Sequence, residues 1–292
     1  MAISNIDLRV DSRQAVSGLK AAQRQVGLLN GATKGLLNTM GPLAVAFSGV
    51  ALVRNYFKGF GEAEKATQAL KTLGVEAKVL NSKLLEVSNS LGGLYSQTQL
   101  TTAAYDVASA GFVKASDAAA VLEASALGAK GGLSELGTVA NAVTSVLNAY
   151  GKSADESERL VDGFIQTQND GKIILDQYAK FIGRLAPTAA ATNVSIEELN
   201  AAISTITAQG VPVQATFTGL NQALVSILKP SAEAEKLAKK LGIEFNEAGL
   251  RSQGFADFMA DVKAKTGGST TALVKLFGSV DALKAVLPLV ND

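Results

Sequence analysis

Glycines at the ends of helix-length segments restrict the fold of this chain more than any other feature of its sequence. Between them, apolar residues recur with a helical period over segments of about 12 to 20 residues. Glycine favours the position after a helix because it enters the left-handed region without steric cost. The glycines that predict helix ends are Gly111, Gly131 with Gly132, Gly151, Gly171, Gly210 and Gly242.

Serines and prolines mark the beginnings and boundaries of the same segments. In the capping box S-x-x-E/Q, the serine hydroxyl and the acidic or amide side chain each accept a hydrogen bond from the other residue's backbone N–H. Proline interrupts a helix interior and therefore predicts a boundary. The predicted boxes begin at Ser96, Ser153 and Ser195, the other N-cap candidates are Ser116, Ser134 and Ser231, and the boundary prolines are Pro187, Pro212 and Pro230.

These signals predict an all-α fold of extended or loosely packed helical hairpins. Ser125–Leu147 resembles Ser204–Leu228, since both consist of a helix, a glycine break and a second helix, and this weak internal repeat favours stacked hairpins. The mostly alternating pattern of Ile3–Val10 predicts one short N-terminal β-strand. We expect a strand-plus-helix segment over residues 1–40, an apolar helix over 41–75 and helical hairpins over 76–292.

Three glycines in the N-terminal segment recur at every fourth residue. Gly27, Gly31 and Gly35 would therefore share one face of a predicted helix. Such a face permits close contact with another helix. A weak helix that bends is the other interpretation, because each interior glycine costs about 1 kcal/mol relative to alanine. The sequence leaves both interpretations open.

The most apolar stretch of the chain is Gly41–Val53. It is shorter than the ~20 residues that a helix needs to cross a bilayer. A buried helix is one interpretation, and a membrane-active segment is the alternative. The residues that would form either one are Leu43, Ala44, Val45, Phe47, Val50, Leu52 and Val53.

The chain contains no histidine and no cysteine. This composition excludes cysteine nucleophiles, the Ser-His-Asp triad, disulfides and the usual zinc, iron and copper ligand sets. A carboxylate-only Mg²⁺ or Ca²⁺ site and a Ser-Lys pair stay open. A net charge of +1 provides no electrostatic footprint for nucleic acid, so specific nucleic-acid recognition is not expected.

Two kinds of short motif could carry the remaining chemistry, and both have a simpler explanation. Ser17–Lys20 and Ser226–Lys229 match S-x-x-K, but no partner motif accompanies either match. The acidic cluster of Asp155, Glu156, Glu158 and Asp162 lies at a predicted helix start, where carboxylates complement the helix dipole. The sequence therefore predicts a protein that is not an enzyme and has no cofactor or metal.

Several distinct blocks of sequence follow one another in a specific order and spacing over about three quarters of the chain. They are Leu100–Gly111, Ala119–Gly131, Val139–Val143, Asn148–Gly151, Leu185–Ala190, Val194–Ala202, Leu241–Ile243 and Leu276–Gly278. From Gly59 onward, the chain with these blocks resembles the core region of phage tail tape measure proteins. Each block alone is only low-complexity helix, whereas their order and spacing together are specific to that family.

The resemblance implies a structural virion protein that is made in the host cytoplasm and held in the lumen of the tail tube. Such a protein acts in tail assembly and length determination and is released during DNA ejection. The implied partners are copies of the chain matching the tail symmetry (three or six), tube, tip or baseplate proteins, and assembly chaperones. The alternative is a membrane-active helical protein that contacts the host membrane transiently and aids DNA passage. The family contributes no catalytic residue here.

Overall fold

The computed structural model of the chain describes residues 64–291. The chain divides into two compact units, Met1–Gly61 and Glu62–Asp292, and the described residues belong to the second. The predicted strand at Ile3–Val10, the glycine face from Gly27 to Gly35 and the apolar stretch Gly41–Val53 lie outside them. Those three predictions therefore stay predictions.

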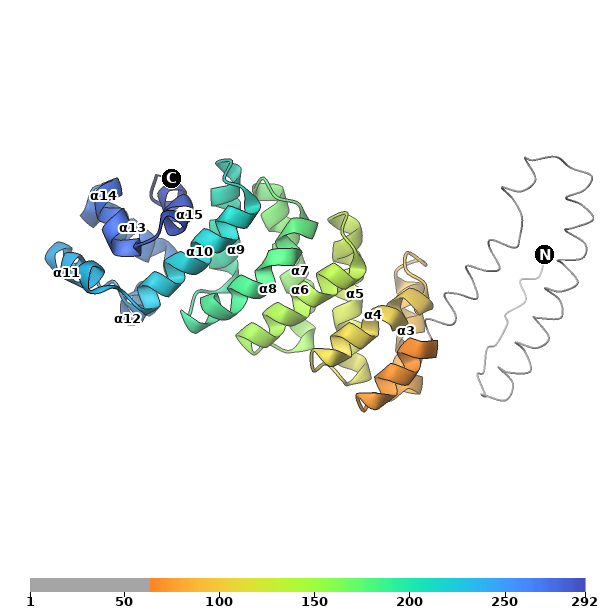
Figure 1. The fold of residues 1–292 in the computed structure, drawn as a ribbon. Coiled ribbons are helices and arrows are strands. Elements are labelled where there is room, and N and C mark those ends of the chain that lie inside the picture. The colour runs from red at the N-terminus through yellow and green to blue at the C-terminus, as the bar shows by residue number, and fades with distance from the viewer. Residues whose placement is uncertain (1–63, 292) are drawn as a thin grey trace, which may run out of the picture. The chain divides into compact units, whose positions relative to one another are not determined.

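Every regular element within residues 64–291 is helical, which confirms the all-α prediction. Residues 64–72 are helical and precede the first labelled helix (Figure 1). The labelled helices are α3 (Ala77–Ser90), α4 (Gln97–Ser109), α5 (Ala115–Gly131), α6 (Leu136–Tyr150), η2 (Ala154–Glu156), α7 (Ser157–Asp170), α8 (Leu175–Ala191), α9 (Ile196–Ala208), α10 (Val213–Leu228), α11 (Ala232–Leu241), α12 (Glu247–Gln253), α13 (Phe255–Thr266), α14 (Thr270–Phe277) and α15 (Val280–Asn291).

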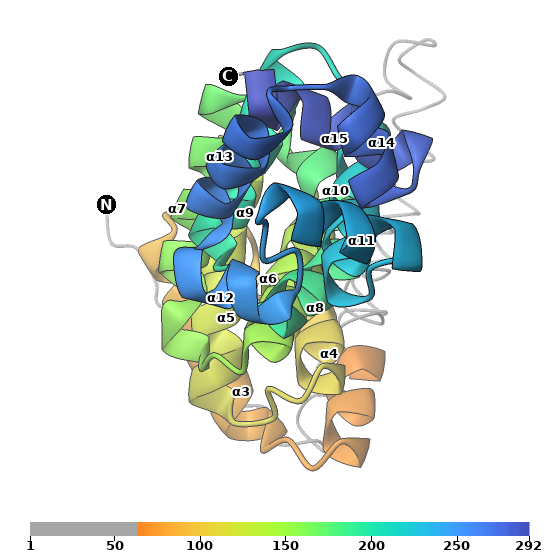
Figure 2. The ribbon, with the colours of Figure 1, turned by 90° about the vertical axis from the view of Figure 1, so that its left-hand side faces the viewer.

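Helices α3 to α10 form a stack of four hairpins arranged in two layers. In one layer α3, α5, α7 and α9 pack against each other in succession, and in the other α4, α6, α8 and α10 do the same (Figure 2). Each helix also packs against the next one along the chain. Every hairpin thus buries its apolar faces on its neighbours, as in helical repeat proteins.

The weak sequence repeat corresponds to this stack. Ser125–Leu147 runs from α5 into α6, and Ser204–Leu228 runs from α9 into α10. Both segments therefore cross from the first layer to the second at a short loop. The predicted hairpins follow one another in a row, each packed on the next. A continuous buried core joins them.

Helices α11 to α15 close the C-terminal end of the stack. Helix α15 packs on α10 and α9, while α11 packs on α14 and α12 on α13. Phe245 lies at the centre of this group, with its ring centroid 5.9 Å from that of Phe258 and 5.1 Å from that of Phe277. These aromatic contacts join α13 and α14 around Phe245, while α15 covers the last hairpin of the stack.

Close approach between helices depends on small residues. A Cβ atom added to Gly128 of α5 would lie 2.5 Å from Cγ1 of Val161 in α7. One added to Gly219 of α10 would lie 2.5 Å from the backbone oxygen of Asp281 in α15. Real side chains do not adopt such distances, so these helices pack at a separation that only glycine allows.

Many of the predicted helix ends are confirmed. Ser96 and Ser195 form complete capping boxes with Gln99 and Glu198, and the Ser231 hydroxyl accepts a bond from Ala234 N–H. Pro212 is the N-cap of α10 and Pro230 lies between α10 and α11. The glycines at predicted helix ends with left-handed or other positive φ angles are Gly111, Gly151, Gly210 and Gly242.

Of three further serine predictions, one was partly right and two were wrong. Ser153 is the N-cap of η2, so the predicted helix start is confirmed, but its capping box does not form, because its hydroxyl donates to the carboxylate of Asp155. Helix α5 begins before Ser116, at Ala115. Ser134 lies one residue before the N-cap of α6, where its hydroxyl donates to Oδ1 of Asp176 instead.

Pro187 was also placed wrongly, since it lies inside α8 and not at its boundary. The helix continues to Ala191 because Leu185, Ala186 and Ala189 are buried between the helices that pack on α8. Tertiary packing therefore outweighs the missing N–H of the proline. The exposed position of the proline ring explains why it disturbs no core contact.

Gly132 and Gly171 follow helices as predicted, but their φ angles of −92° and −106° are not left-handed. A Cβ atom on Gly132 would lie 2.4 Å from Cδ2 of Leu175, and one on Gly171 would lie 2.6 Å from Oγ1 of Thr207. These two glycines are required for close contact with the next hairpin instead of for the turn itself.

Candidate functional site

The loops of the stack form two edges. The loops that join the first layer to the second are residues 91–96, 132–135, 171–174 and 209–212; we call them the apolar edge. The loops that lead back are residues 110–114, 151–156 and 192–195; we call them the polar edge. The two edges differ in how successive hairpins are connected.

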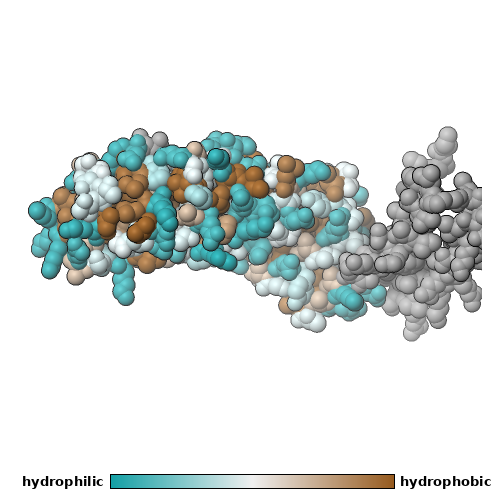
Figure 3. Space-filling model, turned by 45° about the horizontal axis from the view of Figure 1, so that its top comes forward, coloured by the Kyte–Doolittle hydropathy of each residue, from teal (hydrophilic) through white to brown (hydrophobic). Residues whose placement is uncertain are grey.

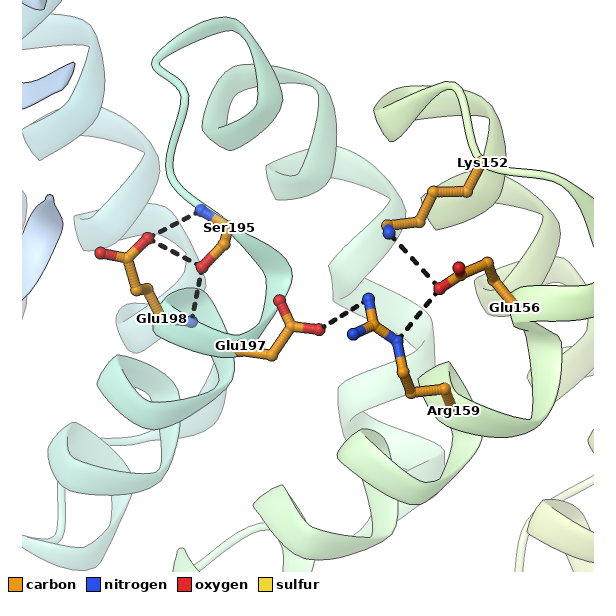
Figure 4. A network of polar contacts seen from close by, with 6 residues as sticks. All are labelled: Lys152, Glu156, Arg159, Ser195, Glu197 and Glu198. Carbon is orange, nitrogen blue, oxygen red and sulfur yellow. Dashed lines mark hydrogen bonds and ion pairs between the residues drawn. The ribbon is translucent and has the colours of Figure 1, made fainter.

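Ion pairs connect two hairpins along the polar edge (Figure 4). Lys152 Nζ lies 3.4 Å and Arg159 Nε lies 3.0 Å from Oε2 of Glu156. Arg159 also reaches across to Glu197 at the start of α9, with Nη2 3.2 Å from Oε1. All four side chains are at least partly exposed, so each pair contributes roughly 0 to 1 kcal/mol. Of these pairs, the one between Arg159 and Glu197 connects α7 to α9.

Glu198 connects the stack to its C-terminal cap. Its Oε2 accepts hydrogen bonds from Ser195 N–H at 2.9 Å and from Ser195 Oγ at 2.8 Å, while Oε1 accepts one from Phe255 N–H at 2.7 Å. Partial burial opposes ionisation of Glu198, but the bonds from Ser195 and Phe255 outweigh it and lower the pKa of the carboxyl. One carboxylate thus serves the N-termini of both α9 and α13.

Two further side chains bridge hairpins at the polar edge. Asn148 Nδ2 donates to the backbone oxygen of Ala110 at 2.9 Å, and the Tyr150 hydroxyl donates to that of Val194 at 3.0 Å. Burial, together with the negative charges of Glu197 and Glu198, raises the pKa of Tyr150. Tyr150 is therefore a neutral hydrogen-bond donor at any physiological pH.

The apolar edge instead presents aliphatic side chains to solvent. Leu94, Leu133 and Ile174 occupy three successive loops and are 45%, 89% and 54% exposed. Figure 3 shows hydrophobic areas interspersed with hydrophilic ones on one face of the described unit. Exposed apolar side chains also occur elsewhere, for example Val113 and Leu228 near the polar edge. At the apolar edge they occupy the loops of three consecutive hairpins.

Direct contacts show that the loops of the apolar edge are neighbours. Ser134 Oγ donates to Oδ1 of Asp176 at 3.3 Å, which joins the second loop to the third hairpin. Burial raises the pKa of Tyr95 in the first loop, and the negative charge of Glu135 in the second loop raises it further. The backbone of Leu133 has a φ angle of +52°, a left-handed conformation that is uncommon for leucine.

The acidic residues singled out in the sequence do not assemble a reactive centre. Glu156 pairs with Lys152 and Arg159, and the Ser153 hydroxyl donates to the carboxylate of Asp155 and lowers its pKa. Within residues 64–291, no group of three or more carboxylates, histidines or cysteines could hold a metal ion. The carboxylates serve as helix caps and ion-pair partners.

The S-x-x-K match in α10 also has a structural role. Ser226 Oγ lies 2.8 Å from the backbone oxygens of both Gln222 and Phe277, so it ties α10 to the end of α14. Lys229 is exposed, and within residues 64–291 no hydrogen bond joins it to Ser226. The other match, Ser17–Lys20, lies outside the described residues.

The most important contacts of the site had no local signal in the sequence. The bond from Phe255 N–H to Glu198 spans 57 residues, and the pair of Arg159 and Glu197 joins two hairpins. The isolated position of Leu133 after two glycines was visible, but nothing in the sequence showed that it would be exposed. Among the helices of residues 64–291, none combines the length and hydrophobicity that a bilayer crossing requires.

Comparison of the sequence with known proteins identifies relatives of this chain. Residues 81–278 match the family model described as phage-related minor tail protein. A probable tape measure protein of Clostridium phage phiCD119 is 27% identical over 303 residues, which cover 95% of this chain and 32% of that protein. The tape measure protein of Pneumococcus phage Dp-1 is 28% identical over 155 residues, or 51% and 13% of the two chains. The chain thus spans about a third or less of these relatives, and no solved structure matches it.

Proposed function

Because the chain belongs to the phage-related minor tail proteins, the family of the tail tape measure proteins, we propose that it lies in the tail tube and determines tail length. A structural role in the tail, and hence a place in the virion, follow from the family. The position in the tube lumen, the action during assembly and the release during DNA ejection are the proposal's finer parts.

The stack of like hairpins is the observation that supports a measuring role. Each hairpin contacts mainly its neighbours, so adding one lengthens the stack by about one helix-packing distance, ~10 Å. If the same hairpin of about 40 residues were drawn out into continuous helix, it would add about 60 Å at 1.5 Å per residue. The two modes of measuring therefore predict different length increments.

An in-frame series in the phage genome tests this proposal. One variant lacks residues 157–195, which comprise α7, α8 and the loops that follow them, and two others carry that segment in two or three copies. Electron microscopy of the tails should show a length that rises linearly with hairpin number. A slope near 10 Å supports a folded ruler and one near 60 Å an extended one, whereas unchanged tails would rule out length determination.

The proposed partners are other components of the tail. They are copies of this chain in the number set by the tail symmetry (three or six), tube, tip or baseplate proteins, and assembly chaperones in the host cytoplasm. The near-neutral net charge of +1 supports a partner that is protein instead of specifically bound nucleic acid. Affinity purification of assembling tails, with copy number from native mass spectrometry, tests this set.

A role without catalysis or cofactor is part of the same proposal. In residues 64–291, the prominent carboxylates Glu156, Glu197 and Glu198 are engaged by cations or by backbone N–H groups.

The division into segments 1–40, 41–75 and 76–292 also stays a prediction, which limited proteolysis with mass spectrometry can test.

A membrane-active role in DNA passage is the second candidate, and the apolar stretch of the sequence favours it. Leu43, Phe47 and Val50 belong to a segment with no charged residue between Gly41 and Val53. If this segment inserts, the chain should release dye from liposomes and Val50→Asp should abolish the leakage. Absence of leakage by the unmodified chain would remove this candidate.

A further inference from the structure

The C-terminal cap, residues 230–291 at the end of the stack, is built from short helices (Figure 1). Helices α11 to α15 contain 10, 7, 12, 8 and 12 residues. The α-helices α3 to α10 contain 13 to 17 residues. A helix shorter than ~12 to 15 residues is marginal on its own in water, and so is a domain of ~60 residues. The cap therefore depends on contacts outside itself.

The start of α13 is capped by a residue of the stack. The N-cap of α13 is Gly254, which has no side chain to accept a hydrogen bond and whose φ and ψ angles of 80° and 165° are essentially restricted to glycine. Phe255 N–H donates instead to Oε1 of Glu198 in α9 at 2.7 Å. The break between α12 and α13 is thus stabilised from outside the cap.

The ends of α14 and α15 are also bound by side chains of the stack. Ser226 Oγ of α10 donates to the backbone oxygen of Phe277, the last residue of α14, at 2.8 Å. Gln209 Nε2 donates to the backbone oxygen of Pro288, near the end of α15, at 3.1 Å. Both carbonyl groups lie in a last helical turn, where intrahelical N–H partners run out. Undocking would remove these partners from both helices.

Helix α15 contacts the stack in a different way from a further hairpin. The second-layer helices α4, α6, α8 and α10 begin at the apolar edge and end at the polar edge, so they run in the same direction. Between Gln209 and Ser226, by contrast, the contacted positions on the cap run backwards from residue 288 to residue 277. Helix α15 is therefore antiparallel to α10, and the interface between cap and stack differs in kind from those between hairpins.

The contacts with the stack reach the apolar centre of the cap directly. The ring of Phe277 packs on that of Phe245, which also contacts Phe258 of α13. The carbonyl of the same Phe277 is the group that Ser226 binds. Within the cap, α11 packs on α14 and α13 packs on α12 and α15, so each helix relies on another. Loss of docking at α14 and α15 therefore disturbs all five helices.

We propose that the cap is an order–disorder switch: α11 to α15 are folded only while they are docked on α9 and α10, and they unfold together when that docking is lost. The hairpins from α3 to α8 keep their own neighbours and stay folded. The released segment of about 60 residues reaches up to about 200 Å at ~3.4 Å per residue, and α10 becomes the uncovered end of the stack. This inference goes beyond the proposed function and does not depend on the measurement of tail length.

Hydrogen exchange of the full chain in low concentrations of denaturant, followed by mass spectrometry, provides the first test. Amides in the interior of α13, α14 and α15 should exchange together, with one common opening free energy that is lower than that of α5 to α8. A cap that undocked as a rigid body would keep these hydrogen-bonded amides protected. Protection equal to that of α5 to α8, or a separate opening for each cap helix, would overturn the inference.

Substitutions that remove single docking bonds provide the second test. Ser226→Ala and Gln209→Ala should each accelerate exchange roughly fivefold, by one factor throughout α13, α14 and α15, because these helices share one opening reaction. The matched control is Asn148→Ala, which removes a hydrogen bond of 2.9 Å at the polar edge and should leave exchange in the cap unchanged. Acceleration confined to the amides beside each substituted residue would show that the bonds act only locally, and the switch would be wrong.

Discussion

The carboxylate of Glu198 accepts a hydrogen bond from the backbone N–H of Phe255 at 2.7 Å, so one side chain in the fourth hairpin begins a helix of the C-terminal cap. The same carboxylate completes the capping box of α9 with Ser195. Repeat stacks need a specialised last element to cover the final hairpin. This contact is a direct polar connection between that element and the repeats.

Replacing Glu198 with alanine should therefore destabilise two helix starts at once. We expect a loss of about 1 to 2 kcal/mol in the free energy of unfolding, as for other N-cap and charged hydrogen-bond losses. Hydrogen exchange should accelerate at Phe255 as well as at the start of α9. Glu197→Ala, which removes only the exposed pair with Arg159, is the matched control and should cost less than about 1 kcal/mol. Equal losses in the two variants would contradict this role.

The contribution of Glu198 should depend on pH in a defined direction. Its pKa is lower in the folded protein than the ordinary value of about 4.3, so its stabilisation is fully present above that value. The stabilisation is then lost as the pH falls through the folded-state pKa. Urea unfolding of the parent chain and Glu198→Gln should differ near neutral pH and converge in acid. A difference that is constant with pH would show that the charge is irrelevant.

Two helix glycines with different surroundings should respond differently to alanine. In Gly219→Ala the new Cβ would meet the backbone oxygen of Asp281 at 2.5 Å, so α15 must move and unfolding should become easier by about 1 to 2 kcal/mol. In Gly183→Ala the nearest atoms are Oγ and Cβ of Ser145 at 3.1 and 3.3 Å, so the hydroxyl can rotate away and the side chain needs to shift by only a few tenths of an ångström. The gain of about 1 kcal/mol in helix propensity should then leave a small net change. Denaturant unfolding measures both, and a milder effect at Gly219 would contradict the packing.

Pro187→Ala should stabilise the chain. The substitution restores the N–H that α8 lacks and removes an exposed ring, while the buried neighbours Leu185 and Ala186 stay in place. Because proline also restricts the unfolded chain by about 0.4 to 1 kcal/mol, we expect a net gain of about 1 to 2 kcal/mol. A thermal melt of the variant measures it. A lower melting temperature would mean that the proline shapes α8 in a way its neighbours need.

Local signals in the sequence predicted local features of the fold. Ser96 and Ser195 were identified as helix starts because a capping box involves only residues three apart. Gly151 and Gly242 were identified as helix ends because a left-handed residue is a local requirement. The weak repeat likewise predicted stacked hairpins, since each hairpin repeats the same short-range pattern.

Features that depend on distant parts of the chain could not be predicted in this way. Pro187 stays helical because of helices that pack on α8, and Ser134 is diverted from capping by Asp176 of the next hairpin. The bond between Glu198 and Phe255 has no sequence pattern at all. The exposure of Leu133 and Ile174 in neighbouring loops likewise depends on how the two layers of helices alternate.

The nearest-neighbour packing of the stack also determines how the chain would respond to mechanical force. A pull on one terminus loads a single hairpin interface at a time, because no contact connects α3 or α4 directly to α9 or α10 strongly enough to share it. Unravelling would thus proceed as a series of small, similar steps. A protein of this kind could be threaded through a narrow passage under a low and nearly constant tension.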